Sequence, residues 1–203
     1  SHMLEVKGFD TKILLTRDAT RSNVFGALGQ ITSAALPGDL VVVSNSSHGS
    51  QVPNYDNDES DAMDETICLY DGQVLDDELE AIWAMFCPGV RIMFISDSCH
   101  SGTMARLIGP QSSVLVQPGS RSTPPEIAAA AAIQNEDMYR AIAASPVVRD
   151  RKPITAHVLA FGGCQDNQTA MDGPVNGAFT GALLRTVRDY PKATLGQVIT
   201  AGE

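Results

Sequence analysis

The residues LVVVSNSSHGSQ at 40–51 and RIMFISDSCHSG at 91–102 decide the fold of this chain. Each segment has an apolar run at or near its start, 40–43 and 92–95, that is typical of a strand buried on both faces of a sheet. Each then passes into a loop rich in Gly and Ser, and the two loops carry His48 and Cys99. Because sites in open parallel α/β sheets form at the carboxyl ends of the strands, we expect the two loops to lie at the same edge.

Helical and strand patterns alternate along the rest of the chain. A helix is expected after Thr20, which is a good N-cap residue. Strands that alternate with helices predict an α/β fold with a mostly parallel central sheet and helices on both of its faces. The other expected elements are a strand at 13–15, a polar loop over 45–65, a helix over 76–86, a strand at 158–161, and helices at 178–187 and from 195.

The composition is typical of a soluble protein. The chain has 203 residues, 43% of them hydrophobic, which is enough for one domain with a sizeable core. Its longest apolar run, at 40–43, is far shorter than a membrane span of ~20 residues, and no basic and apolar leader precedes it. We therefore expect a cytoplasmic protein that does not enter membranes, with its four cysteines as free thiols.

Acidic residues are concentrated in one stretch of the sequence. The net charge is −10, and 12 of the 24 acidic residues lie between Ser22 and Val90, where there is no Lys or Arg. This distribution argues against nucleic acid as a partner and favours cations or basic peptides.

The segment from Gln111 to Lys152 interrupts the alternation of strands and helices. It begins with Gln, Ser, Pro and Gly, contains the run Ala128–Ala132, and ends in a basic stretch. We expect an insertion of this length to be mobile or to form helices on the outside of the domain. The predicted organisation is a tag remnant (1–3) and one domain (4–203), divided into a first part (4–110), this insertion (111–153) and a second part (154–203).

His48 and Cys99 are the residues that point to catalysis. A Cys thiolate is a strong nucleophile once a nearby imidazole takes its proton, and small residues such as Gly49 leave backbone N–H groups open to an oxyanion. The alternative, for each residue taken alone, is a buried structural thiol and a hydrogen-bonded loop histidine. His100 is a weaker candidate for the base, because adjacent side chains on an extended segment point apart.

The chain resembles the metacaspases and orthocaspases, which are caspase-like cysteine peptidases, over roughly 8–199. The His-to-Cys spacing of about fifty residues is also the caspase spacing. The resemblance implies a caspase-like α/β fold and an enzyme that hydrolyses peptide bonds in polypeptides. The blocks that carry it are SSHGSQ, DNDESDAMDETICLYD, VLDDEL, DSCHSG, AFGGCQDNQTA and NGAFTGALLRTV.

The resemblance also implies roles for individual residues. His48 would be the general base and Cys99 the nucleophile, and the backbone N–H groups of Gly49 and Cys99 would form the oxyanion hole. The family cuts after Arg or Lys, which requires an acidic pocket. Asp97 and Ser46 match positions that line this pocket, and Asp166 is a further candidate. The alternative for Asp97 is a carboxylate that accepts hydrogen bonds from local backbone N–H groups.

Many metacaspases are activated by calcium, although the hydrolysis itself needs no cofactor. Asp64, Asp76 and Asp77 match three of the family's acidic ligand positions. At the fourth position, seven residues after the Cys, this chain has Arg106, whose charge would repel a cation. A solvated acidic loop followed by a helix start, where acidic side chains are favourable, explains the same residues equally well.

Two further expectations and three alternatives concern the whole chain. Family members begin with a strand and a helix that this sequence lacks before 8–15. A peptidase that cuts after basic residues can also cut its own exposed loops where they contain such residues. We therefore expect self-cleavage in the insertion, after Arg149 or Arg121. The alternatives are a caspase-like binding or regulatory domain without turnover, a cysteine-type phosphatase, which needs an Arg where this chain has Ala105, and a zinc site from cysteines that lack paired spacing.

Overall fold

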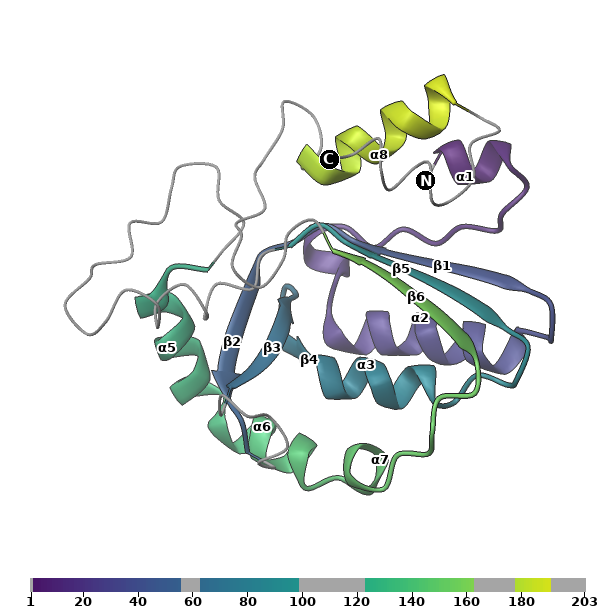
Figure 1. The fold of residues 1–203 in the computed structure, drawn as a ribbon. Helices are drawn as coiled ribbons and strands as arrows, with labels where there is room; N and C mark the ends of the chain where they lie inside the picture. The colour runs from purple at the N-terminus through teal and green to yellow at the C-terminus, as the bar shows by residue number, and fades with distance from the viewer. Residues whose placement is uncertain (1, 56–62, 99–122, 163–177, 191–203) are drawn as a thin grey trace.

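The computed structural model describes residues 2–55, 63–98, 123–162 and 178–190. The described residues form two sheets of three strands each, and helices lie around them (Figure 1). Several residues that the sequence analysis singles out lie outside the described ranges, among them Cys99, His100, Arg106, Arg121 and Asp166.

The strands β1 (Leu40–Asn45), β5 (Arg91–Ser96) and β6 (His157–Gly162) form a parallel sheet in the order β1-β5-β6. Their registers place the starts of all three strands beside one another, so the three strands also end at one edge. The predicted α/β fold with a parallel central sheet is confirmed. The strands predicted at 91–96 and at 158–161 are confirmed as well, although β6 is longer at both ends.

A second sheet contains β2 (Gly49–Pro53), β3 (Met63–Cys68) and β4 (Gln73–Leu75), which pair antiparallel. The prediction of a polar loop over 45–65 is therefore wrong where β2 and the start of β3 lie. Hydrophobic alternation, which is the usual signal of a strand, is missing here because Ser50, Asp64 and Thr66 take buried positions.

The helix α2 (Arg21–Ala34) begins where the sequence predicts, because the side chain of Thr20 accepts a hydrogen bond from the N–H of Asn23 at 3.2 Å. The strand predicted at 13–15 is wrong, since these residues are irregular and the side chains of Ile13 and Leu15 are exposed. The helix predicted from 195 lies outside the described residues. The remaining helical elements are α1 (His2–Val6), the 3-10 turn η1 (Thr16–Asp18), α3 (Asp76–Trp83), α5 (Pro125–Gln134), α6 (Glu136–Ala143), α7 (Pro146–Arg149) and α8 (Ala178–Asp189).

The main core lies between the parallel sheet and the helices α2 and α3. Leu28 of α2, Val41 of β1 and Ile92 of β5 are buried together. The ring of Trp83, from α3, lies 5.8 Å from the ring of Phe94. Figure 1 shows α1 and α8 on the opposite side of this sheet, so helices cover both of its faces as predicted.

The described part of the insertion is helical. Its helices α5 and α6 bring Ala132 and Tyr139 against Val52 and Leu75 of the small sheet, which forms a second core. The short helix α7 contacts α3. Across the described ranges, no helix combines the length and the apolar character that crossing a membrane requires.

Candidate functional site

The carboxyl ends of β1 and β5 lie side by side at one edge of the parallel sheet. Asn45 and Ser96 are the last paired residues, and the N–H of Asp97 still donates to the carbonyl of Asn45 at 2.9 Å. Beyond this point the hydroxyls of Ser96 and Ser98 lie 2.7 Å apart. The segment that leads to the predicted nucleophile therefore follows the end of β1 as far as Ser98, the last described residue before it.

His48 lies in the loop between β1 and β2. Its side chain is exposed, and its carbonyl accepts a hydrogen bond from the N–H of Cys68 at 3.0 Å. The strand β3 thus holds the backbone of the predicted base. His48 and Cys99 each lie three residues beyond the pair formed by Asn45 and Ser96, and both chain segments leave the parallel sheet at one edge. Cys99 itself lies outside the described residues, so its position beside His48 stays a prediction.

Gly49 presents its backbone N–H away from β3. It pairs with Ile67, and the bond from the N–H of Cys68 to the carbonyl of His48 marks this pair as a non-hydrogen-bonded one. The carbonyl of Gly49 points the same way and accepts from the N–H and the hydroxyl of Thr123, at 3.0 Å each. An N–H that faces away from the ladder is what an oxyanion hole uses.

Asp97 is fully buried at the end of β5. Its Oδ2 accepts a hydrogen bond from the N–H of Thr180 at 3.0 Å, in the first turn of α8. The positive end of a helix dipole stabilises a carboxylate in this position. Asp97 therefore connects the predicted nucleophile loop to the C-terminal part of the chain.

The other residues predicted to bind substrate or to be cut are dispersed. Ser46 is exposed in the same loop as His48. Arg149 is the last residue of α7 and is exposed, with its N–H bonded to the carbonyl of Ser145. Asp166 and Arg121 lie outside the described residues, so their predicted roles stay predictions.

The three predicted calcium ligands do not make a calcium site together. Asp64 and Asp77 are buried, but Nη1 of Arg151 lies 2.9 Å from Oδ1 of Asp77, and Oδ1 of Asp76 accepts the N–H of Asp77. Among the described residues, no three His, Cys, Asp or Glu side chains are grouped closely enough to hold a metal ion. Calcium needs six to eight oxygen ligands, several of them carboxylates, and in this structure Asp77 is already paired with Arg151.

Sequence reasoning missed three residues that the structure places at or near these predicted sites. Thr123 bonds Gly49, Thr180 bonds Asp97, and Arg151 pairs with Asp77. The first two give no signal in the sequence, because a backbone or hydroxyl contact leaves no pattern. Arg151 does give a signal, since an acidic stretch that lacks bases must be neutralised by residues from elsewhere in the chain.

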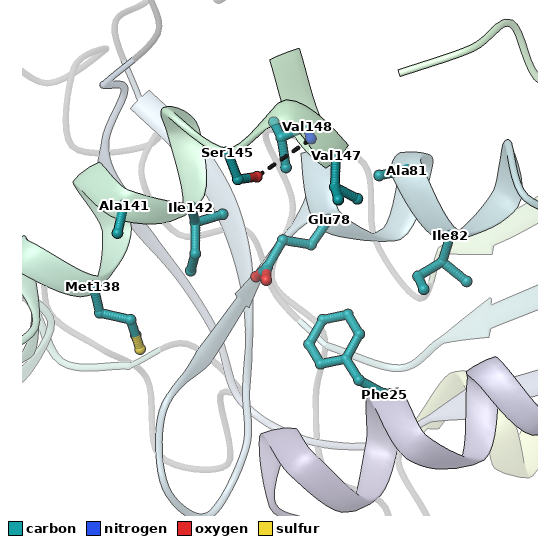
Figure 2. A pocket seen from close by; sticks show the side chains of 10 residues that line it. All are labelled: Phe25, Glu78, Ala81, Ile82, Met138, Ala141, Ile142, Ser145, Val147 and Val148. Carbon is teal, nitrogen blue, oxygen red and sulfur yellow. Dashed lines mark hydrogen bonds between the residues drawn. The ribbon is translucent and has the colours of Figure 1, made fainter. Parts of the chain in front are cut away.

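An apolar cavity of about 390 Å³ lies between α2, α3, α6 and α7. Figure 2 shows Phe25, Ile82, Met138 and Ile142 pointing into it, and Glu78 is its one charged lining residue. The carboxylate of Glu78 is bound by Arg21, at 2.6 Å and 3.0 Å. Of the predicted site residues that the structure describes, His48, Gly49, Ser46 and Asp97, none lines this cavity.

The family model described as "Metacaspase, peptidase C14 domain" matches residues 2–108. Metacaspase-1 of Schizosaccharomyces pombe is 34% identical over 195 residues, which cover 84% of this chain and 46% of that protein. Metacaspase-1 of Cryptococcus neoformans is 28% identical over 234 residues, which cover 97% of this chain and 51% of that protein. The chain thus spans about half the length of these curated relatives.

One solved structure has a fold similar to that of this chain. The crystal structure of protein GSU0716 from Geobacter sulfurreducens superposes with a TM-score of 0.86 and 37% sequence identity. The similarity covers 99% of this chain and 74% of that one.

Proposed function

We propose that this chain, which belongs to the metacaspase (peptidase C14) family, is a caspase-like cysteine endopeptidase that cuts polypeptides after Arg or Lys. In this proposal Cys99 is the nucleophile and His48 the general base, and the enzyme acts in the cytoplasm and cuts itself. One observation carries the proposal: β1 and β5 are adjacent and parallel, and their last paired residues are Asn45 and Ser96. In the sequence, His48 comes three residues after Asn45 and Cys99 three residues after Ser96.

The proposed reaction proceeds through a thioester. His48 takes the thiol proton of Cys99, and the sulfur attacks the carbonyl carbon of the scissile bond. The charge that moves to the carbonyl oxygen is bound by the N–H groups of Gly49 and Cys99. His48 then gives the proton to the leaving amine as the C–N bond breaks, and a water molecule, activated by His48, hydrolyses the thioester.

Specificity for a basic residue is assigned to Asp97. Its charge lies two residues before the nucleophile, and a charge-assisted, bidentate pair with a substrate guanidinium is stronger than a neutral hydrogen bond. Asp97 is covered in this structure, so a substrate side chain reaches it only if a neighbouring group moves aside. Ser46 and Asp166 are proposed as further contacts of the same substrate residue.

The dyad is tested by three variants assayed on fluorogenic peptides that end in Arg, Lys or Asp. Cys99→Ala is expected to abolish hydrolysis, and His48→Ala to lose at least the ~10²–10⁴-fold that a general base supplies. His100→Ala is the matched control, because it removes an imidazole beside the nucleophile and is expected to keep much more activity. Iodoacetamide labelling, read by mass spectrometry, is expected at Cys99 before Cys68 or Cys87.

Three results would refute parts of this proposal separately. An essential His100 with a dispensable His48 would overturn the assignment of the base. Efficient cleavage after Asp would overturn the basic specificity. A folded chain without any thiol-dependent turnover would leave a caspase-like binding domain as the function.

A further inference from the structure

We infer that Arg151 serves as an internal cation beside Asp77, so that the acidic cluster which calcium would bridge is neutralised by the chain itself. The acidic cluster is defined by the four acidic residues in and beside the first turns of α3: Asp76, Asp77, Glu78 and Glu80. The inference concerns regulation of the proposed peptidase, and rests on that function only for the activity measurement below.

The contacts of Arg151 are those of a bridging cation. Its Nη1 lies 2.9 Å from Oδ1 of Asp77, and its Nε lies 3.2 Å from Oε2 of Glu80. The Asp77 side chain is only 9% exposed, so its charge requires a positive partner nearby. A planar guanidinium with several N–H donors can serve two carboxylates at once.

The position of Arg151 is held by the helix before it. α7 packs on α3, and Figure 2 shows Val147 and Val148 of α7 over the α3 residues Glu78 and Ala81. Val148 is buried, and its carbonyl accepts a hydrogen bond from Nη1 of Arg151 at 3.3 Å. The guanidinium is therefore directed at α3 by a docked element.

A second arginine, Arg21, neutralises a third carboxylate of the cluster, that of Glu78. Both carboxylate oxygens of Glu78 accept hydrogen bonds from Arg21, which also donates to the carbonyl of Gln73. Arg21 comes immediately before the stretch without bases, and Arg151 comes from far beyond it. Two arginines thus supply, inside the fold, positive charge that the sequence of this stretch lacks.

This arrangement has a consequence for calcium. A divalent cation must displace the guanidinium of Arg151 to reach Asp77, and the chain holds that guanidinium in place at every calcium concentration. We therefore expect the wild-type protein to be indifferent to calcium. Removal of Arg151 leaves a partly buried group of like charges, which attracts an added cation.

The test compares thermal midpoints in calcium and in chelator, with all variants in the Cys99→Ala background. The wild-type midpoint is expected to be equal in both solutions. Arg151→Ala is expected to lower the midpoint by about 5–10 °C in chelator, because it strands a buried carboxylate. Calcium at about a hundred times its dissociation constant then restores about 5–10 °C of that loss.

Lys152→Ala is the matched control, since it removes the same charge from the next residue, which is exposed. The thermal midpoint of Lys152→Ala is expected to be the same in calcium and in chelator. If Arg151→Ala does not fold, Arg151→Met keeps most of the aliphatic stem and is measured in the same way. Direct calcium binding by calorimetry is expected for the Arg151 variants and not for the wild type.

Each outcome decides the inference. Calcium binding or stabilisation of the wild type would overturn it, as would an Arg151 variant that ignores calcium or a Lys152 variant that responds equally. Peptide hydrolysis by the active chain is expected to be the same in calcium and in chelator. If no hydrolysis is found at all, the proposed function fails, while the midpoint and binding measurements still decide the role of Arg151.

Discussion

The carboxylate of Asp97 has one observed contact, with α8, and one proposed role, in binding a basic substrate residue. It is fully buried, and it binds the first turn of α8 through the N–H of Thr180. The proposed specificity requires the same charge to receive a substrate guanidinium. The two roles can be separated experimentally, because only substrate binding depends on the charge of the substrate.

Asp97→Asn is expected to lower kcat/KM for Arg peptides by about 10- to 100-fold, since a charge-assisted hydrogen bond is replaced by a neutral one. For a peptide that carries norleucine in place of Arg, kcat/KM is expected to differ by less than about threefold between Asp97→Asn and the wild type, because norleucine has no charge to pair with Asp97. Asn keeps an acceptor oxygen for the N–H of Thr180, so the thermal midpoint is expected to move little. Equal loss on both peptides, with a lowered midpoint, would mean that Asp97 only anchors α8.

At the level of elements, α7 affects where the chain can cut itself. Peptidase grooves bind extended segments, and Arg149 is the last residue of this helix. Cutting after Arg149 requires α7 to unwind, which removes the buried Val148 from its contacts and withdraws the support of Arg151. Of the two predicted sites, Arg121 is therefore favoured.

Self-cleavage is expected to occur first after Arg121 when the wild-type chain is incubated under conditions in which peptides are cut. Arg121→Ala is expected to remove the first fragment pair, whereas Arg149→Ala is expected to leave it unchanged. Mass spectrometry of a time course identifies the new termini, and Cys99→Ala in parallel is expected to stay intact. A first fragment that ends at Arg149 would contradict this order.

At the level of the whole molecule, the insertion is part of the fold. Tyr139 of α6 is completely buried, and its hydroxyl donates to Oε1 of Gln73 at 2.6 Å. β6, which follows the insertion in the chain, completes the parallel sheet beside β5. For this reason the fragments of a chain cut after Arg121 are expected to stay associated.

Burial raises the pKa of Tyr139 above its ordinary value of 10.0. Above pH 10.0 the folded state therefore keeps a proton that the unfolded state releases. The contribution of Tyr139 to the free energy of unfolding is fully present below pH 10.0 and is lost as the pH rises through the raised pKa of the folded state. Tyr139→Phe is expected to cost about 1–3 kcal/mol near neutral pH, because Gln73 loses its donor. The same variant is expected to flatten the alkaline fall in stability.

Urea unfolding at about pH 7 and about pH 11 measures both effects. Tyr190→Phe is the control, since the side chain of Tyr190 is 64% exposed and its removal is expected to change neither value. An alkaline fall of the same steepness in Tyr139→Phe and in the wild type would contradict the assignment to Tyr139.

The sequence by itself determined the parts of this protein that depend on neighbouring residues. The apolar runs at 40–43 and 91–96 predicted two buried strands, and Thr20 predicted the start of α2. The motifs around His48 and Cys99, together with the other sequence blocks, predicted the family, which the match over 2–108 confirms. Each of these signals lies within a few residues, where the side-chain pattern directly reflects burial or capping.

Only the tertiary structure decided the small sheet and the contacts between distant segments. β2 and β3 bury polar residues because the insertion helices cover them, and no local pattern shows that cover. Arg151 and Asp77 stand 74 residues apart, and Thr123 and Gly49 also stand 74 residues apart. Such pairs form because the fold excludes water from a carboxylate or a carbonyl. The buried group then needs a positive charge or a hydrogen-bond donor, and the tertiary structure determines which residue supplies it.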